Sequence, residues 1–423
     1  MSYRFQESHL SVLMPNESCA ELGPAQPYVS EELYRQKAEL NQAKSQLDKY
    51  FLASKQDEKY KHNWLYFQNI VDTYRDLRFK VGKEFNAGII TNAWLKYYEI
   101  YEQYKFIPAK LDRKYIAFFN AELPGAALSA FNHYMKTMRK SVQFDWRASS
   151  LAPSPDTKNS AEALGDTYGL YEMNKDHWLM TILSQGDPMP EDYNSGDVTV
   201  AQNILDFERK VGPGSPLGGA DLYSHDAGID VSTTADGKLG FNDQELANAK
   251  IHFGCALSAF VTLRPGGVFI GKQYTFFETF TWNLLMIYSG LFDKFYICKP
   301  LTSRPYNSEV YLVGLGFHGL SPALRTMMFD RLTNFTTAPF FPMPDAQGRN
   351  TECIHCIESF SRLVFGQQAQ IILQNVNLFD KYGYHLQELR TMLSKGKYAH
   401  IMRWLAKYRI LSIKDHDKLA HRA

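Results

Sequence analysis

RPGGVFIGKQYTFFETFTWNLLMIYSGLFDKFYICKPLTSRPYNSEVYLVGLGF (264–317) is the stretch that decides the fold of this chain. Its apolar runs predict a strand, an aromatic-rich helix and two further strands, over 266–274, 275–291, 295–299 and 310–317. The loop 300–308 is too short for a parallel crossover, so the last two strands are expected to pair antiparallel. Two charges stand out in these strands: Lys272 inside the first and Glu309 at the start of the last.

The composition is that of an ordinary globular protein. Of 423 residues, 45% are hydrophobic and 22% charged, which excludes wholesale disorder. The formal net charge of +1 lacks the basic excess of a non-specific nucleic-acid binder, so any RNA contact must come from a local patch. The apolar runs are too short to span a membrane and the first residues lack a secretory signal. With five scattered cysteines, we expect a soluble, intracellular protein with reduced thiols and no membrane partner.

The chain before this stretch alternates strands and helices. Strands are expected over 114–123, 141–148 and 220–226, and helices over 126–138, 196–211 and 242–263. With the antiparallel last pair, this order is typical of an α/β, Rossmann-like methyltransferase sheet.

Helical extensions are predicted at both ends of this sheet. We expect an N-terminal arm and helical region over 1–85, a Rossmann-like domain over 86–320 and a C-terminal helical region over 321–423. Within the first region, residues 1–30 are expected to form an arm laid over the surface, and one helix is expected over about 59–81. The helices of the first region are interpreted as a cap on the main domain, with an oligomerisation element as the alternative. Cys353 and Cys356 form a lone C-x-x-C pair, which indicates buried helix cysteines rather than a metal site.

The turn after the strand 114–123 is a candidate ligand loop. The strand ends in the acid Glu122, and a Pro-Gly turn leads directly into a helix, which brings backbone N–H groups near a ligand. Small residues at 125–127 permit close approach to the backbone. The turn lacks G-x-G-x-x-G, so NAD and FAD are not indicated.

Charged residues near the other element ends are candidates for the same site. Asp145 is interpreted as an acid at the end of a strand, suited to ribose hydroxyls, with an exposed loop acid as the alternative. Asp197 is expected at or near the N-cap of the helix 196–211, and Asp226 at the carboxyl edge of the sheet. Lys96 lies beside the apolar face of a helix capped by residue 91 or 92, where an isolated lysine is usually a surface residue.

Five segments together resemble a known family. TNAWLKYYEI, NAELPGAALSAFNHYMK, HDAG, GGVFIGKQYTFFE and KPLTSRPYNSEVYLVGLGF are similar to the successive motifs of FtsJ-like ribose 2′-O-methyltransferases, most of all to the cap-2 type that acts on eukaryotic mRNA. The resemblance covers about 91–317 and implies a catalytic tetrad and a cofactor loop for S-adenosylmethionine, without a metal. The tetrad would be Lys96, Asp226, Lys272 and Glu309, and the cofactor loop Glu122, Leu123, Pro124, Gly125, Ala126 and Ala127.

The resemblance also implies roles for the tetrad. Lys272 would orient and deprotonate a ribose 2′-hydroxyl, Lys96 would tune and position Lys272, Asp226 would lie near the sulfonium, and Glu309 would fix the lysines. A free lysine with a pKa near roughly 10.4 is protonated at neutral pH, so the surroundings of Lys272 must decide whether it acts as a base.

Two departures from the family pattern bear on this interpretation. Leu123 stands where the family usually has a small residue, which predicts a crowded cofactor loop. The segment between Asp226 and Lys272 is longer than in cellular relatives, so Asp236 competes with Asp226 for the tetrad. We favour Asp226 because it directly follows the strand ADLYSH.

The expected substrate is capped mRNA. Lys299, Arg304 and Tyr306 precede Glu309 and are candidates for phosphate and base contacts, with an ordinary solvated loop as the alternative. Trp64 and Tyr274 are candidate stacking partners for the cap base. Other capping or transcription proteins are possible partners, and viral members of the family imply a site of action in the host cytoplasm and packaging in the virion. The alternatives are a methyltransferase for ribosomal or transfer RNA and a catalytically silent relative that binds RNA or protein.

Overall fold

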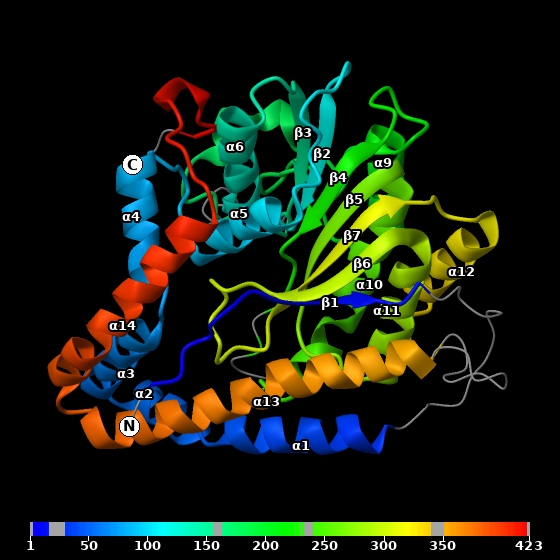
Figure 1. Cartoon of the computed structure of the whole chain (residues 1–423). Coiled ribbons are helices and arrows are strands. Elements are labelled where there is room, and N and C mark those ends of the chain that lie inside the picture. Colours follow the sequence, from blue (N-terminus) through cyan, green and yellow to red (C-terminus); the bar gives the residue numbers. More distant parts are fainter. Residues whose placement is uncertain are drawn as a thin grey trace.

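A mixed seven-stranded sheet forms the centre of the computed structural model, which describes residues 3–16, 30–154, 163–229, 231, 240–339 and 351–420 (Figure 1). The strands are β1 (Leu10–Met14), β2 (Tyr115–Asn120), β3 (Phe144–Ser149), β4 (Ala220–His225), β5 (Leu263–Gln273), β6 (Phe292–Lys299) and β7 (Val310–Phe317). Their order is β1-β6-β7-β5-β4-β2-β3. Strands β3, β2, β4 and β5 are parallel, and β7 is antiparallel to both β5 and β6. The predicted Rossmann-like sheet with an antiparallel last strand is confirmed.

Helices cover both faces of this sheet. They are α1 (Glu31–Ser45), α2 (Asp48–Gln56), α3 (Glu58–Val71), α4 (Arg75–Phe85), α5 (Asn92–Tyr104), α6 (Ala126–Met138), α8 (Leu170–Met173), α9 (Ala201–Val211), α10 (Gln244–Thr262), α11 (Thr279–Leu291), α12 (Pro322–Thr333), α13 (Thr351–Tyr382) and α14 (Leu386–Lys407). Helices α5 and α6 share one hydrophobic core with the sheet, and α9, α10 and α11 share the other. The central strands β2 and β4 are buried along their whole length, which explains the almost continuously apolar sequence of β2, whereas β4 also buries Asp221, Ser224 and His225.

The N-terminal segment contributes an edge strand to the sheet. Residues before 30 were expected to form an arm over the surface, but β1 pairs antiparallel with β6, from Leu10 opposite Lys299 to Met14 opposite Phe295. The apolar run LSVLM supplies the backbone partners that the outer edge of β6 would otherwise lack.

The terminal helices pack against one another. The long α13 runs beside α1, and α14 lies against α3 (Figure 1). Trp64 and Phe67 of α3 pack on Phe379 of α13. The helix expected over 59–81 is divided into α3 and α4, because Asp72 adopts extended backbone and its carboxylate accepts from the N–H of residue 74. Among the described residues, no helix is both long and apolar enough to cross a membrane.

A buried carboxylate on α5 connects these distant segments. Glu99 has no exposed surface and lies one turn after Lys96. It accepts hydrogen bonds from His9 Nδ1 (2.8 Å), Leu301 N (2.6 Å), Thr302 N (3.1 Å), Thr302 Oγ1 (2.9 Å), Trp404 Nε1 (3.2 Å) and Tyr408 Oη (3.3 Å). The N-terminal segment, the loop after β6 and α14 therefore meet at one side chain.

Burial disfavours charge on both members of the pair between His9 and Glu99. Hydrogen bonds outweigh this effect, so the pKa of His9 is raised to about 10 and the pKa of Glu99 is lowered. The pair is therefore ionised at neutral pH. The stabilisation of the folded state by this pair is fully present between pH values of roughly 4.3 and 6.5, which are the pKa values of Glu and His in an unfolded chain. The part that comes from His9 is lost as the pH rises through about 10.

We expect Glu99→Gln to lower the free energy of unfolding by about 3–5 kcal/mol, because a buried imidazolium loses its counter-charge. Urea denaturation at pH 7 measures the loss. Glu58→Gln is the control, since Glu58 is 87% exposed and pairs only with Lys61 among described residues, so its loss should stay below about 1 kcal/mol. Between pH 7 and pH 10, the free energy of unfolding should also fall more in the wild type than in Glu99→Gln. Equal losses in the two variants would contradict this account.

Candidate active site

Four charged residues predicted from the sequence lie together at one edge of the sheet. The parallel strands β4 and β5 end at this edge, and the antiparallel β7 begins there. Asp226 directly follows β4, Lys272 is the second-last residue of β5, and Glu309 directly precedes β7. Lys96 reaches the same place from α5.

These residues form two ion pairs. Lys96 Nζ lies 2.6 Å from Glu309 Oε1, and both side chains are about one-tenth exposed. Lys272 Nζ lies 3.4 Å from Asp226 Oδ1. Asp236, the alternative to Asp226, lies outside the described residues. The structure therefore brings Asp226 to Lys272.

A tyrosine that the sequence analysis did not select links the two pairs. The hydroxyl of Tyr311 donates to Asp226 Oδ1 at 3.4 Å, and Lys96 Nζ lies 5.6 Å from the centre of its ring. Tyr311 stands opposite Lys272 in the register of β5 and β7. The signal was present in the motif NSEVY, where this tyrosine follows Glu309 by two positions. Ser303 was also missed, and its hydroxyl donates to Glu309 Oε1 at 3.1 Å.

β4 and β5 pack closely against each other next to the two ion pairs, which keeps the ends of these strands together. His225 stands opposite Gly271, and a Cβ at Gly271 would lie 2.3 Å from its Nε2. Only glycine allows the buried ring to lie against β5 here. Burial lowers the pKa of His225 well below its ordinary value, so a neutral imidazole lies behind Lys272.

The electrostatics of the four residues favour their charged forms. Burial opposes the charge of Lys272, but Asp226, Tyr274 and Glu309 outweigh it and hold the pKa of Lys272 above its ordinary value. Burial likewise opposes the charge of Glu309, and the nearby lysines, first of all Lys96, lower the pKa of Glu309 to about 2. In this state Lys272 is an ammonium group.

The predicted cofactor loop lies at the same edge, after β2. Glu122 is buried, its Oε1 accepts from Leu128 N at 2.7 Å, and burial raises the pKa of Glu122 well above its ordinary value. Gly125 has φ +107°, and a Cβ there would lie 2.2 Å from Leu170 Cδ2, so the glycine is required. Leu123 packs partly against the core beneath α6. Its side chain is thus accommodated by the protein.

Two buried polar atoms near this loop lack a partner among described residues. They are Asn120 Nδ2 and Ser149 Oγ, on the last residues of the neighbouring strands β2 and β3. They offer a donor and a hydroxyl to a polar ligand at the carboxyl edge. This arrangement fits a nucleoside-containing cofactor such as S-adenosylmethionine. No group of three or more potential metal ligands occurs among the described residues.

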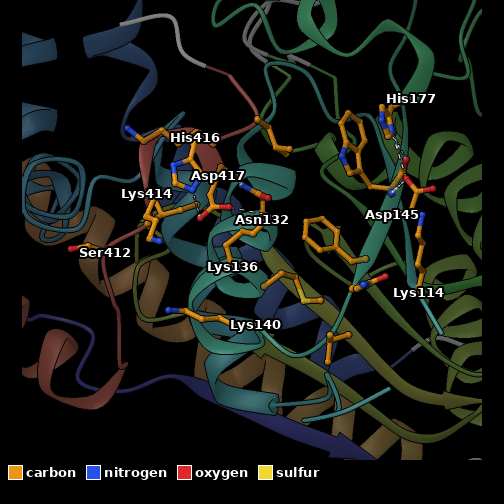
Figure 2. Close-up of a pocket in the computed structure, with 18 residues that line it drawn as sticks. Lys114, Asn132, Lys136, Lys140, Asp145, His177, Ser412, Lys414, His416 and Asp417 are labelled. Carbon is orange, nitrogen blue, oxygen red and sulfur yellow. Dashed lines mark hydrogen bonds and ion pairs between the residues drawn. The ribbon is translucent and has the colours of Figure 1, made fainter. Parts of the chain in front are cut away.

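Asp145 lies at the wrong end of its strand for cofactor binding. It was taken as an acid at a carboxyl edge, but β3 begins at Phe144, so Asp145 is its second residue and faces a separate pocket (Figure 2). Its carboxylate pairs with Arg147 at 3.0 Å. Asp197 lies nearer to the carboxyl edge of the sheet. Its neighbour Gly196 packs against the backbone oxygen of Ser150, the residue that directly follows β3. Asp197 precedes α9 by four residues and bonds Thr199 N, so it is not a helix cap.

The three predicted RNA contacts differ in accessibility. Lys299 is 2% exposed, and its Nζ donates to Asn307 O (2.7 Å), Asn307 Oδ1 (2.8 Å) and Glu309 O (2.6 Å). Burial lowers the pKa of Lys299 to about 7. Tyr306 has a buried hydroxyl, whereas Arg304 remains 40% exposed while bonding Asp72. Lys299 thus fixes the loop that carries Glu309 and has no donor left for phosphate.

Comparisons with known proteins agree on one family. Residues 89–317 match the model of the FtsJ-like methyltransferase family. The chain is 36% identical over 365 residues to the probable methyltransferase EP424R of African swine fever virus, covering 84% of this chain and 80% of that protein. It is 28% identical over 316 residues to the mouse protein named cap-specific mRNA (nucleoside-2′-O-)-methyltransferase 2, covering 73% of this chain and 38% of that protein.

We expect Lys299→Met to lower the free energy of unfolding by about 2–4 kcal/mol, because three partly buried acceptors lose the donor that the buried Lys299 provides. Urea denaturation measures the change. Lys294→Met is the control, since Lys294 lies exposed on the same strand and should cost less than about 0.5 kcal/mol. A stable Lys299→Met protein with weakened RNA binding would instead support the phosphate contact expected from the sequence.

Proposed function

Because this chain belongs to the FtsJ-like methyltransferase family, we propose that it is an S-adenosylmethionine-dependent ribose 2′-O-methyltransferase acting on the 5′ cap region of mRNA. The observation that carries the proposal is the pairing of Lys96 with Glu309 and of Lys272 with Asp226 at the carboxyl edge of the sheet. Similarity to a protein named as cap-specific supports the choice of substrate.

The residues of this edge divide into a cofactor part and a proton-transfer part. The loop 122–127 and the side chains of Asn120 and Ser149 would hold S-adenosylmethionine, with Asp197 beside them. When bound, the cofactor supplies a methyl group activated by a positive sulfur, which keeps the electron pair of the broken carbon–sulfur bond.

Lys272 is the group that takes the proton. As the ribose 2′-oxygen bonds to the methyl carbon, its hydroxyl proton passes to Lys272 Nζ, which must first be a neutral amine. Asp226 and Tyr274 hold this amine in place and favour its charged form, so the neutral fraction is small near pH 7. Lys96 donates a hydrogen bond to Glu309 and balances part of its negative charge. Glu309 therefore raises the pKa of Lys272 less than it would alone.

Two residues outside the tetrad would support it. Tyr311 contacts Asp226 through its hydroxyl and Lys96 through its ring, so it keeps the two ion pairs at a fixed separation. Arg304 is the most exposed of the three residues expected to contact RNA, and its guanidinium would meet a phosphate of the same RNA strand.

We expect Lys272→Ala to lower methyl transfer to a short capped RNA by about 10²- to 10⁴-fold, because the proton acceptor is removed. Transfer of a radioactive methyl group measures the rate, and calorimetry with S-adenosylmethionine should show little change in affinity. Lys294→Ala, on the surface of β6, is the control and should retain wild-type activity. Uncapped RNA of the same sequence should be a much poorer acceptor for the wild type. Equal transfer to both RNAs would point to another RNA substrate, and unchanged activity of Lys272→Ala would rule out its role.

The rate of methyl transfer should rise with pH. The pKa of Lys272 is raised above its ordinary value. At pH values below that pKa, the fraction of Lys272 in the neutral form therefore increases about tenfold for each pH unit. Single-turnover rates between pH 6.5 and 9 should therefore increase without reaching a plateau. The affinity for S-adenosylmethionine, measured over the same range, separates this effect from cofactor binding. A flat rate profile would show that Lys272 is not the base.

A further inference from the structure

A basic hollow lies far from the tetrad, at the amino ends of β2 and β3. Its volume is about 680 Å³, and it lies between α6, the start of these two strands and the C-terminal segment 412–419 (Figure 2). Five lysines line it: Lys114, Lys136, Lys140, Lys414 and Lys418. We call this hollow the lysine groove. In a chain of net charge +1, it concentrates positive charge in one place.

Three of these lysines are exposed and form no ion pair with the described residues. No described carboxylate lies within ion-pair distance of Lys114, Lys140 or Lys414, and each side chain is exposed to solvent. The two acids that line the groove have partners of their own. Asp145 pairs with Arg147 at 3.0 Å, and Asp417 lies 3.5 Å from Lys136. The groove therefore keeps a net positive charge.

An aromatic pair forms one wall of the groove. The ring of His177 stacks on Trp146 with centroids 4.3 Å apart and planes 18° from parallel. Its Nδ1 lies 2.9 Å from the backbone oxygen of Trp146, which fixes the ring, and its side chain is 35% exposed. Lysines beside a partly exposed flat ring provide contacts to both phosphates and bases of a single strand.

We propose that the lysine groove binds the backbone of single-stranded RNA several nucleotides away from the methylated ribose. This inference rests on the proposed function, since it concerns the same RNA. The groove lies at the amino ends of β2 and β3 and the tetrad at the opposite, carboxyl edge of the parallel strands, and the six residues of β2 span roughly 20 Å between these two edges. An RNA strand that reaches both must extend several nucleotides beyond the acceptor. The groove selects RNA of sufficient length and carries no sequence preference.

The test is RNA binding by the full chain with Lys114→Glu, Lys140→Glu and Lys414→Glu combined. The probe is a fluorescent, uncapped RNA of about 20 nucleotides, measured by anisotropy without cofactor. Affinity should fall by roughly 10- to 100-fold, and the slope of log affinity against log salt should decrease in magnitude by about 2, from three contacts at roughly 0.7 each. His177→Ala should weaken binding several-fold without changing that slope.

The matched control carries the same charge change elsewhere. Lys59→Glu, Lys294→Glu and Lys395→Glu alter three exposed lysines of α3, β6 and α14 that do not line the groove. This protein should bind RNA within about threefold of wild type. If the groove variant has a lower melting temperature than the wild type, a second variant gives the same comparison with a smaller charge change. It combines Lys114→Gln, Lys140→Gln and Lys414→Gln. Equal affinity in the groove and control variants would overturn the proposal.

Methyl transfer separates this inference from the proposed function. With a capped RNA of about 20 nucleotides, the groove variant should show a raised KM and an unchanged kcat, whereas a capped RNA of about four nucleotides should be methylated as by wild type. If wild type transfers no methyl group but the binding difference persists, the proposed function fails and the groove stands. If methyl transfer occurs and KM is unchanged for both lengths, the groove has no part in substrate binding.

Discussion

The carboxylate of Glu99 is the contact on which the arrangement of the site depends. It is fully buried and accepts from donors of the N-terminal segment, the loop after β6 and α14. A buried charge of this kind is tolerated only when its hydrogen-bonding capacity is filled, so each segment must be in place for the others to be stable. Helix α5 therefore holds Lys96 within a network that spans most of the chain.

The loop between β6 and β7 is held from both sides by the buried side chains of Glu99 and Lys299. Glu99 binds its first residues, Leu301 and Thr302, and Lys299 binds its last ones through Asn307 and the backbone oxygen of Glu309. Such a loop can present Glu309 to Lys96 at a fixed distance without regular secondary structure. Preorganisation of this kind reduces the cost of aligning charged groups during catalysis.

The sequence was informative where the signal is local and less so where it depends on distant contacts. The short loop before β7 required antiparallel pairing, and the family motifs placed Lys272 and Glu309 at one edge. The partner of β1 lies far along the chain, so the short run LSVLM gave no sign of a strand. Lys299 looked like a surface lysine because its three acceptors come from a turn whose shape the sequence does not reveal. Asp145 was misplaced because the strand was expected over 141–148, whereas β3 begins at Phe144 and so has Asp145 near its amino end.

The contacts of Glu99 have a consequence for the order in which the protein becomes competent during synthesis. When the ribosome has completed residue 317, all strands and all four tetrad residues exist, yet Trp404 and Tyr408 are still missing from the buried carboxylate. Until α14 emerges, Glu99 lacks two of its donors, and the loop that holds Glu309 is anchored less firmly. Every tetrad residue thus precedes Trp404 and Tyr408 in the chain, and the site becomes rigid only when the C-terminal segment has packed against Glu99.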